Sequence, residues 1–288
     1  MLDLLQMLCA LPAPCGDEGI AKKYITMKYP DFKEDAFGNL VYRNNGEGEL
    51  IMLYASLDED AVLAMEIKDE KVYFAHIGSR KIYPSMAVSF GGYTGILCEQ
   101  GETKYLYMTD KGEGIEQGRS GVFDGEFEGE TDKDENLLLG KNIANRAAIA
   151  ALLTAENTNK NICVVLGVKS NHTTTGLEGA ISALKPDKTI IFEETKKDKF
   201  AIKMLGEGFG ASEETTEKLA SVLEKADVAF ERTADNTEKT MGAKSSWGNT
   251  AVLGIPALFT EFIRQGIRVK TAKDLSKIVN TILEDGNE

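Results

Sequence analysis

The feature that most constrains the fold is an interruption in the middle of the sequence. Helical periodicity is absent from about residue 61 to residue 138, whereas helices and strands alternate on either side of this stretch. Inside it, short apolar runs such as 72–77, 94–97 and 105–108 are separated by glycine-rich turns. This spacing is typical of a small β-barrel or sandwich. We therefore expect residues 61–138 to form an inserted β-rich domain.

The two flanking segments together predict an α/β domain. Before the insertion, the pattern indicates helices at 1–11 and 18–28 and a buried strand at 50–55. After it we expect helices at 145–154, 179–183, 213–226 and 274–283, strands at 162–168 and 189–192, and a helix end turning into a strand at 251–259. Strands that alternate with helices imply a mixed, largely parallel sheet flanked by helices. The predicted architecture is an α/β domain of residues 1–60 and 139–288, interrupted by the β-rich domain.

The charge balance and the cysteines bear on partners and compartment. The chain carries 33 basic and 46 acidic residues, a net charge of −13. This disfavours nucleic acid, whose phosphates need a basic surface, and anionic membranes. No segment reaches the roughly 18 apolar residues of a membrane span, and the apolar N-terminus carries Asp3 where a signal peptide would be basic. The four cysteines form no C-x-x-C pair, so neither a zinc ribbon nor a redox motif is indicated. Scattered free thiols suit a reducing cytoplasm, which is the expected location.

An acidic run at 124–135 leaves two interpretations open. Many of its carboxylates fall on every second residue, so an extended chain would place them on one face. A cation site is one interpretation. A solvated loop or edge strand is the other, and the more frequent one, because like charges on an exposed edge block aggregation.

Several short phrases stand in a fixed order along the chain. They are PCGDE at 14–18, DAFGNL at 35–40, ASLDE at 55–59, GKNIANRA at 140–147, GLEGA at 176–180, LGEG at 205–208 and KDL at 273–275. The insertion adds AHIG at 75–78 and PSMAV at 84–88. In this order and spacing the phrases resemble the glutamyl-aminopeptidase, or cellulase M-like, family of metallo-aminopeptidases. The resemblance covers nearly the whole chain.

The resemblance implies both a fold and a chemistry. The fold is an α/β peptidase domain interrupted by a β-rich domain, which agrees with the pattern above. In the family, two divalent metals share a bridging carboxylate and a water. A glutamate acts as general base toward that water, and the metals polarise the scissile carbonyl. Members of the family also form large homo-oligomers.

Most positions that match the family's catalytic and metal-binding residues hold other residues here. The first metal histidine corresponds to Ser56, and the bridging aspartate to Ala144, whose side chain has no donor atom. The general base and an adjacent glutamate ligand correspond to Thr173 and Thr174, and a threonine hydroxyl is no base near neutral pH. Asp58 matches the aspartate that orients the first histidine, but no imidazole is left to orient.

Two further ligand positions complete the comparison. Glu193 matches an aspartate ligand and keeps a carboxylate, whereas the last histidine maps to Arg264, a cation that would repel a metal. One carboxylate cannot hold two divalent ions against water, so we expect no resident metal. Arg264 and Lys244 would instead neutralise Asp58 and Glu193. The alternative is that both basic side chains point to solvent.

The chain has only two histidines. We expect His76 to be an ordinary strand residue of the β-rich domain. His172 is expected to be a loop residue beside the cleft, with a ligand contact as the alternative. The candidate cleft residues are Asp58, Asn145, His172, Glu193, Glu194 and Arg264.

Three functions compete on this basis. The first is a catalytically inactive member of the peptidase fold. Such a protein binds a peptide or small molecule in the old cleft, or forms a homo- or hetero-oligomer with an active homologue. The second is an active metal-dependent aminopeptidase with a rebuilt site for two divalent metals, zinc or cobalt. The third is a metal-free glycosidase, for which Asp58 with Glu193 or Glu194 is the obvious pairing. The lost base and bridge favour the first.

Overall fold

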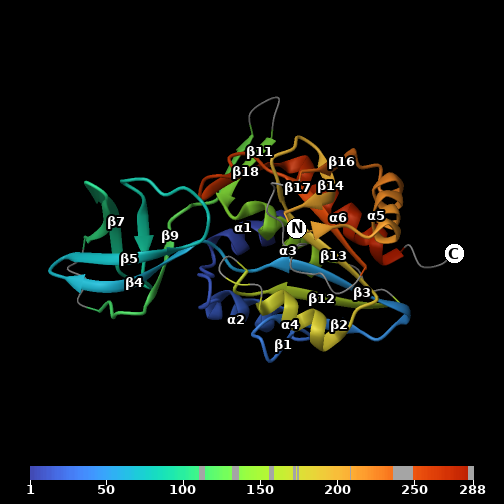
Figure 1. The fold of residues 1–288 in the computed structure, drawn as a ribbon, viewed down its shortest axis with the longest axis horizontal. Helices are drawn as coiled ribbons and strands as arrows, with labels where there is room; N and C mark the ends of the chain where they lie inside the picture. The colour runs from blue at the N-terminus through green and yellow to red at the C-terminus, as the bar shows by residue number, and fades with distance from the viewer. Residues whose placement is uncertain are drawn as a thin grey trace.

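A computed structural model of the chain describes residues 1–109, 114–131, 136–155, 159–170, 173, 175–207, 209–235 and 249–284. Its centre is a large mixed sheet with the strand order β1-β2-β12-β3-β13-β17-β14-β15 and with β16 beside β14 (Figure 1). The central strands β12, β3, β13 and β17 run parallel, and the outer pairings are antiparallel apart from β14 with β16. This confirms the predicted mixed α/β fold. The strands are β1 (Lys33–Glu34), β2 (Leu40–Asn44), β3 (Glu47–Ser56), β12 (Lys160–Gly167), β13 (Lys188–Thr195), β14 (Phe200–Gly206), β15 (Phe209–Gly210), β16 (Phe230–Ala234) and β17 (Asn249–Pro256).

Alternate residues of the central strands face two different helical layers. In β3, Leu53 and Ala55 belong to one apolar core, whereas Met52 and Tyr54 belong to another. Successive side chains of a strand point to opposite faces, so one apolar run supplies both cores. The first core is covered by α1 (Leu2–Ala10), α2 (Gly19–Lys28), α3 (Ile143–Leu153), α5 (Glu213–Lys225) and α6 (Val269–Glu284), and the second by α4 (Thr175–Leu184).

The helix boundaries follow local chemistry. The Ser212 side chain accepts a hydrogen bond from the Thr215 backbone N–H at 3.4 Å and caps α5. Glu213 and Glu214 lie in the first turn and Lys225 in the last, which suits the helix dipole. The α1 helix ends before Pro12, because proline has no N–H to continue the ladder.

The turn at 35–39 joins the sheet to α4. The Asp35 carboxylate accepts hydrogen bonds from the backbone N–H groups of Phe37 and Asn39. The Asn39 side chain then donates to the Gly176 carbonyl at 2.9 Å and accepts from the Val168 N–H at 3.1 Å. A Cβ atom on Gly176 would lie 2.4 Å from the Val168 carbonyl oxygen. The glycine is therefore required for the close approach of α4 to the end of β12.

The expected insertion contains a closed barrel, which lies at the left of Figure 1. Its interior is apolar and includes Val62, Val72, Phe90 and Leu106. In barrel order the strands are β4 (Ala61–Lys68), β5 (Lys71–Ile77), β8 (Thr103–Met108), β7 (Thr94–Gln100), β6 (Ala87–Ser89) and β9 (Ser120–Phe123). These strands lie inside the predicted limits 61–138.

The segment after the barrel pairs with the C-terminal part of the chain. Strands β10 (Glu128–Thr131), β11 (Asn136–Lys141) and β18 (Arg264–Arg268) form a separate antiparallel sheet. Just before β18, Ile263 packs into the barrel core. The barrel is thus joined to the α/β part by packing as well as by chain connections.

One predicted element is wrong. Residues 251–259 were expected to contain a helix end, but residues 249–256 form the single strand β17 between β13 and β14. Thr250 to Ile255 are all buried, so the run has no alternation of apolar and polar residues to distinguish a strand from a helix.

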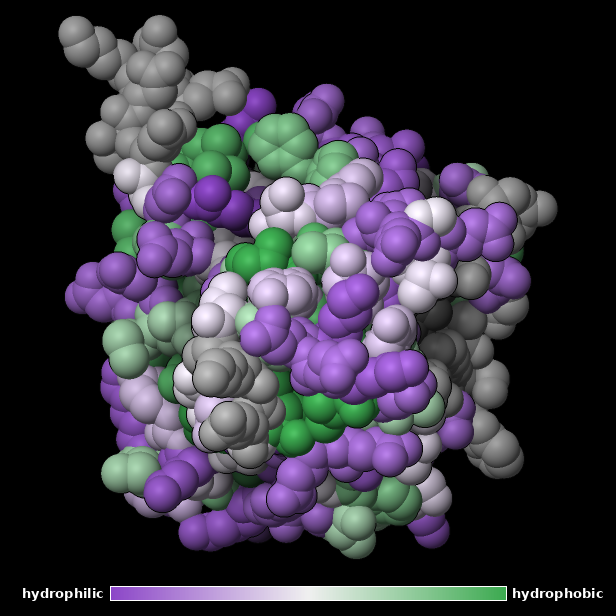
Figure 2. All heavy atoms as spheres, turned by 90° about the vertical axis from the view of Figure 1, so that its left-hand side faces the viewer, coloured by the Kyte–Doolittle hydropathy of each residue, from purple (hydrophilic) through white to green (hydrophobic). Residues whose placement is uncertain are grey.

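The barrel end of the molecule is shown in Figure 2. Hydrophilic residues cover most of this face, with hydrophobic residues visible between them. Exposed hydrophobic residues of the barrel part include Met65, Tyr83 and Tyr107. Among the described residues, no helix is long and apolar enough to cross a membrane.

Candidate functional site

The predicted cleft lies where three parallel strands end. Ser56 closes β3 and pairs in register with Gly167 at the end of β12. Phe192 of β13 pairs with Ala55, which brings Glu193 to the level of Ser56. The helix α3 begins at the same edge, where the Asn142 side chain donates to the Asp58 carbonyl at 2.8 Å. In open α/β sheets, ligands bind outside the carboxyl ends of the strands.

The positions of the expected bridge and base carry no metal-binding chemistry. Ala144 is fully buried in the core beneath the sheet. The Thr173 hydroxyl oxygen lies within hydrogen-bond distance of the Lys169 carbonyl oxygen, at 3.3 Å, and of the Thr175 hydroxyl, at 3.2 Å. The predictions for His172 and Thr174 concern positions outside the described residues.

A lysine stands against the one carboxylate that remains at a ligand position. Lys203 Nζ lies 2.7 Å from Glu193 Oε1, and the two side chains are 3% and 12% exposed. Lys203 comes from β14, which pairs with β17 beside β13. Its Nζ also donates to the Glu194 carbonyl at 3.5 Å. The cation found at Glu193 is therefore Lys203.

Arg264, the expected neutralising cation, makes a different ion pair. Its Nη2 lies 2.5 Å from Glu128 Oε2, and in the β11–β18 pairing Arg264 stands opposite Lys141. The prediction that Arg264 neutralises Glu193 is thus corrected by the pairing of Glu193 with Lys203. Lys244 lies outside the described residues.

Glu194 is held by an arginine from the barrel part. Arg80 Nη2 and Nη1 donate to its two carboxylate oxygens at 2.9 and 3.2 Å. Arg80 Nη1 also donates to the Thr260 carbonyl at 2.6 Å, and Gln265 Nε2 donates to Glu194 Oε2 at 2.5 Å. A bidentate arginine–carboxylate pair of this kind is strong and directional. It fixes the loop after β5 to the edge of the cleft.

Asp60 extends the same network into the barrel. It accepts a hydrogen bond from the Arg80 backbone N–H at 2.9 Å, and Arg80 Nε lies 3.5 Å from its Oδ1. His76, an ordinary residue of β5, places Nε2 3.4 Å from Asp60 Oδ2. Gly78 has a φ of +143°, and a Cβ there would lie 2.1 Å from the Asp60 carboxylate. The glycine is therefore needed for this close contact.

Glu59, Lys141 and Arg146 of the family-like phrases form a buried structural cluster. Glu59 Oε1 accepts from the Ala13 N–H at 2.8 Å and from Lys141 Nζ at 3.1 Å. Arg146 is fully buried, and its Nη2 lies 3.9 Å from Glu59 Oε2. Burial raises the pKa of the neighbouring Cys9 to about 12. This cluster ties the N-terminal segment to the start of α3.

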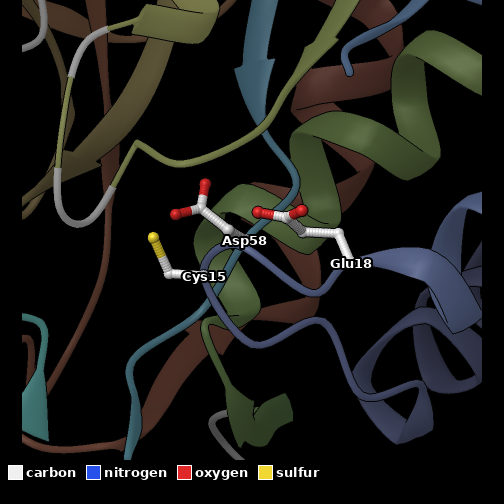
Figure 3. A group of neighbouring side chains, drawn as sticks. All are labelled: Cys15, Glu18 and Asp58. Carbon is white, nitrogen blue, oxygen red and sulfur yellow. The ribbon is translucent and has the colours of Figure 1, made fainter. Parts of the chain in front are cut away.

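A second group of potential ligands lies beside Ser56. Cys15, Glu18 and Asp58 are buried and offer ligand atoms that all lie within 4.8 Å of one another. Figure 3 shows the Asp58 carboxylate between the Cys15 thiol and the Glu18 carboxylate. Cys15 and Glu18 belong to the loop before α2, and Asp58 to the segment between β3 and β4. Asp58 was predicted as a cleft residue, and the other two were not.

The sequence analysis missed the residues that neutralise the cleft carboxylates. A single lysine in the apolar run 200–205 was an available signal for Lys203, because a buried lysine needs an acidic partner. Arg80 gave no local signal, since its partners Glu194 and Thr260 lie 114 and 180 positions away. Cys15 and Glu18 entered the sequence analysis only as part of the phrase PCGDE at 14–18, with no ligand role.

The described residues do not fit the pair of divalent metals that the fold implies. Ala144 offers no donor at the expected bridging position, and the Lys203 ammonium group lies 2.7 Å from one carboxylate oxygen of Glu193. A divalent metal bound to Glu193 would be repelled by this buried positive charge.

Comparisons with known proteins identify the fold. No family model matches the sequence, and no curated protein matches it. Aminopeptidase APDkam598 from the archaeon Desulfurococcus kamchatkensis superposes with a TM-score of 0.85 at 17% identity, covering 99% of this chain and 94% of that one. The Pyrococcus horikoshii TET1 peptidase, which can assemble into a tetrahedron or a large octahedral shell, gives 0.84 at 16% identity over 98% of both chains. An endoglucanase from Thermotoga maritima superposes with a TM-score of 0.78 at 17% identity, covering 98% of this chain and 97% of that one.

At these identities the similarity establishes the fold. The chain has the fold of the TET aminopeptidases and of the endoglucanase-named structure over nearly its whole length. The fold that the sequence phrases implied is thereby confirmed. The activity of the solved structures does not follow from it, because one fold hosts many functions.

Proposed function

We propose that this chain is a non-hydrolytic protein built on the TET aminopeptidase fold. It binds a peptide or small molecule in the cleft at the ends of β3, β12 and β13, or serves as a subunit of an oligomer. No pair of divalent metals takes part. The net charge of −13 argues against nucleic acid as a partner, and the proposal includes a cytoplasmic location.

The observation that carries the proposal is the contact between Lys203 and Glu193. Hydrolysis in this fold needs a polarised carbonyl and an activated water. A lysine ammonium balances the charge of Glu193, but it offers no open coordination position at which a water could be activated or a carbonyl polarised as by a metal. Ala144 and Thr173 stand where the family has the bridging carboxylate and the general base. On this proposal the scaffold lacks the groups that activate water.

The cleft retains polar groups that suit ligand binding. Glu193, Glu194, Asn145 and Thr173 are each partly exposed at the ends of the strands or at α3. Their hydrogen-bonding atoms favour a polar ligand such as a peptide terminus. Assembly into an oligomer is supported by the TET1 peptidase of Pyrococcus horikoshii, which forms closed shells.

Aminopeptidase assays test the proposal directly. The purified chain is incubated with a panel of chromogenic aminoacyl substrates, with added zinc or cobalt and with a chelator. We expect no turnover above the buffer control. Metal-dependent turnover that disappears in a Glu193→Gln variant would refute the proposal. Activity that survives in both Glu193→Gln and Cys15→Ala would belong to a contaminating host peptidase, because Glu193 is the carboxylate retained at a ligand position and Cys15 belongs to the other group of potential ligands.

One observation favours a second function, a metal-dependent aminopeptidase with a rebuilt site. The Cys15, Glu18 and Asp58 group supplies potential ligands beside Ser56. The same assay separates the two functions. For the rebuilt enzyme, turnover requires metal, is abolished by Cys15→Ala and is spared by Cys98→Ala, whose thiol lies in the barrel strand β7.

A further inference from the structure

We propose that Cys15, Glu18 and Asp58 form a binding site for one zinc ion. The site differs from the pair of metals that the fold implies, since none of its three residues matches a ligand position of the family and Asp58 matches the aspartate that orients the first histidine. It stands whether or not the chain hydrolyses peptides. The ion would join the loop before α2 to the end of β3.

The three side chains have the burial expected of a metal site. Cys15, Glu18 and Asp58 are 7%, 3% and 0% exposed, respectively. Exposed acidic groups often cluster without binding an ion, but aspartate and glutamate are rarely buried unless they are paired. Here two buried carboxylates face each other, with a thiol on the far side of Asp58 (Figure 3).

Glu18 gives an independent indication that a cation is needed. Its Oε1 accepts hydrogen bonds from the backbone N–H groups of Gly16 and Lys169, at 2.8 and 3.1 Å. Within the part of the chain that the structure describes, these two backbone N–H groups are the donors found for the Glu18 carboxylate, and no ion pair with a basic side chain is formed. A buried carboxylate without a counter-charge is costly, and a second carboxylate nearby adds repulsion. A divalent cation between the two carboxylates would offset both the cost of burying the charge and the repulsion between them.

Backbone hydrogen bonds already hold the ligand-bearing segments together. The Cys15 N–H donates to the Glu59 carbonyl at 3.3 Å, and the Glu59 N–H donates to the Ala13 carbonyl at 2.9 Å. The Asn142 side chain fixes the Asp58 carbonyl. The two segments are thus positioned by contacts that do not use the ligand atoms. Metal binding then requires little further ordering of the chain.

The donor set selects zinc among common divalent ions. Zinc binds thiolate sulfur at about 2.3 Å and carboxylate oxygen at about 2.0–2.2 Å, with tetrahedral geometry. Neighbouring ligand atoms in such a tetrahedron are about 3.4–3.6 Å apart. Ligand atoms at the 4.8 Å limit would therefore need to close by about 1.2 Å. Calcium and magnesium prefer oxygen alone and more ligands. Three protein ligands leave the fourth position to water.

Cobalt(II) serves as the probe, because a cobalt–thiolate bond produces a charge-transfer absorption in the near ultraviolet. The metal-stripped full chain is titrated with cobalt and then with zinc as competitor. We expect one cobalt per chain with the thiolate absorption, and zinc should displace it. Cys98→Ala, the matched control, also loses one thiol and should behave like the parent chain. Cys15→Ala should lose the absorption and bind cobalt at least tenfold more weakly.

Glu18→Gln provides a second variant that keeps the shape of the side chain and its Oε1 acceptor. It should weaken cobalt binding, whereas the thermal midpoint without metal should equal or exceed that of the parent, because the repulsion between two carboxylates is removed. Absence of the thiolate absorption in the parent chain would overturn the proposal. So would unchanged cobalt affinity in Cys15→Ala. Two cobalt ions per chain with a Cys15-dependent absorption would support this site but refute the proposed loss of the metal pair.

Discussion

Replacing Lys203 by methionine tests the most specific claim about the cleft. Lys203 Nζ lies 2.7 Å from Glu193 Oε1, with both side chains largely buried. At an effective dielectric constant of about 20, the Coulomb energy at this separation is about 6 kcal/mol. Desolvation of the two ions cancels much of it. Removing one partner of a buried pair costs about 3–5 kcal/mol, because the other charge stays behind.

Glu193 is 12% exposed, so the lower end of this range applies. We expect Lys203→Met to lower the free energy of unfolding by about 3 kcal/mol. With a urea m-value of about 2–3 kcal/mol/M, the midpoint falls by about 1–1.5 M. The double variant Lys203→Met/Glu193→Gln should recover most of the loss. Urea titration followed by circular dichroism measures all three proteins.

Lys199→Met is the matched control, because it removes the same charge from an exposed position in the loop before β14. It should stay within about 0.5 kcal/mol of the parent. The reasoning fails if Lys203→Met unfolds at the parent midpoint. It fails equally if the double variant is less stable than Lys203→Met alone, because the loss would then come from packing and not from an unpaired carboxylate.

Three further predictions concern the supports of the fold. Arg80→Ala should lower the free energy of unfolding by about 2–4 kcal/mol. In calorimetry the barrel and the α/β part should then unfold in two separate transitions. A single transition at the parent temperature would contradict the role of Arg80 in joining the two parts. Gly176→Ala should lower the free energy of unfolding by more than about 2 kcal/mol, because its Cβ would lie 2.4 Å from a backbone oxygen. Gly210→Ala, whose Cβ would meet nothing within 4 Å, should melt like the parent in the same thermal-unfolding assay. The Lys188 side chain lowers the pKa of Glu49 below its ordinary value of 4.5. A carboxylate whose pKa is lowered on folding stabilises the fold at pH values above its ordinary pKa, and this stabilisation is lost on acidification. The difference in melting temperature between the parent and Lys188→Met should therefore shrink from about pH 5 to about pH 3. A constant difference would exclude this linkage.

The fold was predictable because its signals are local. The helix at 213–226 carries its own periodicity and cap, the apolar run at 50–55 has the length of a strand, and the change of pattern near residue 61 marks the start of the barrel. The strand β17 was mistaken in part because a run buried on both faces has no period. Helical and strand patterns are then equally compatible with the sequence.

The candidate site was only half predictable, for a different reason. The absence of donor atoms at Ala144 is visible in the sequence itself. The identity of the cation at Glu193 depends on which strand lies beside β13, and that is a property of the tertiary fold. Lys203 of β14 is ten residues away in sequence but reaches Glu193 of β13 across the single intervening strand β17. No sequence motif of fixed spacing would identify Lys203 and Glu193 as partners.

The tie between the turn at 35–39 and α4 has a consequence for how this chain acquires its shape. Asp35, Asn39 and Gly176 belong to the phrases that resemble a metallo-enzyme, yet their contacts involve only protein atoms. Each tie can form during synthesis in a cell starved of zinc or cobalt. The scaffold is therefore independent of metal supply at the moment of folding. Substitutions of the cleft residues can therefore accumulate in such a scaffold without removing the contacts on which folding depends.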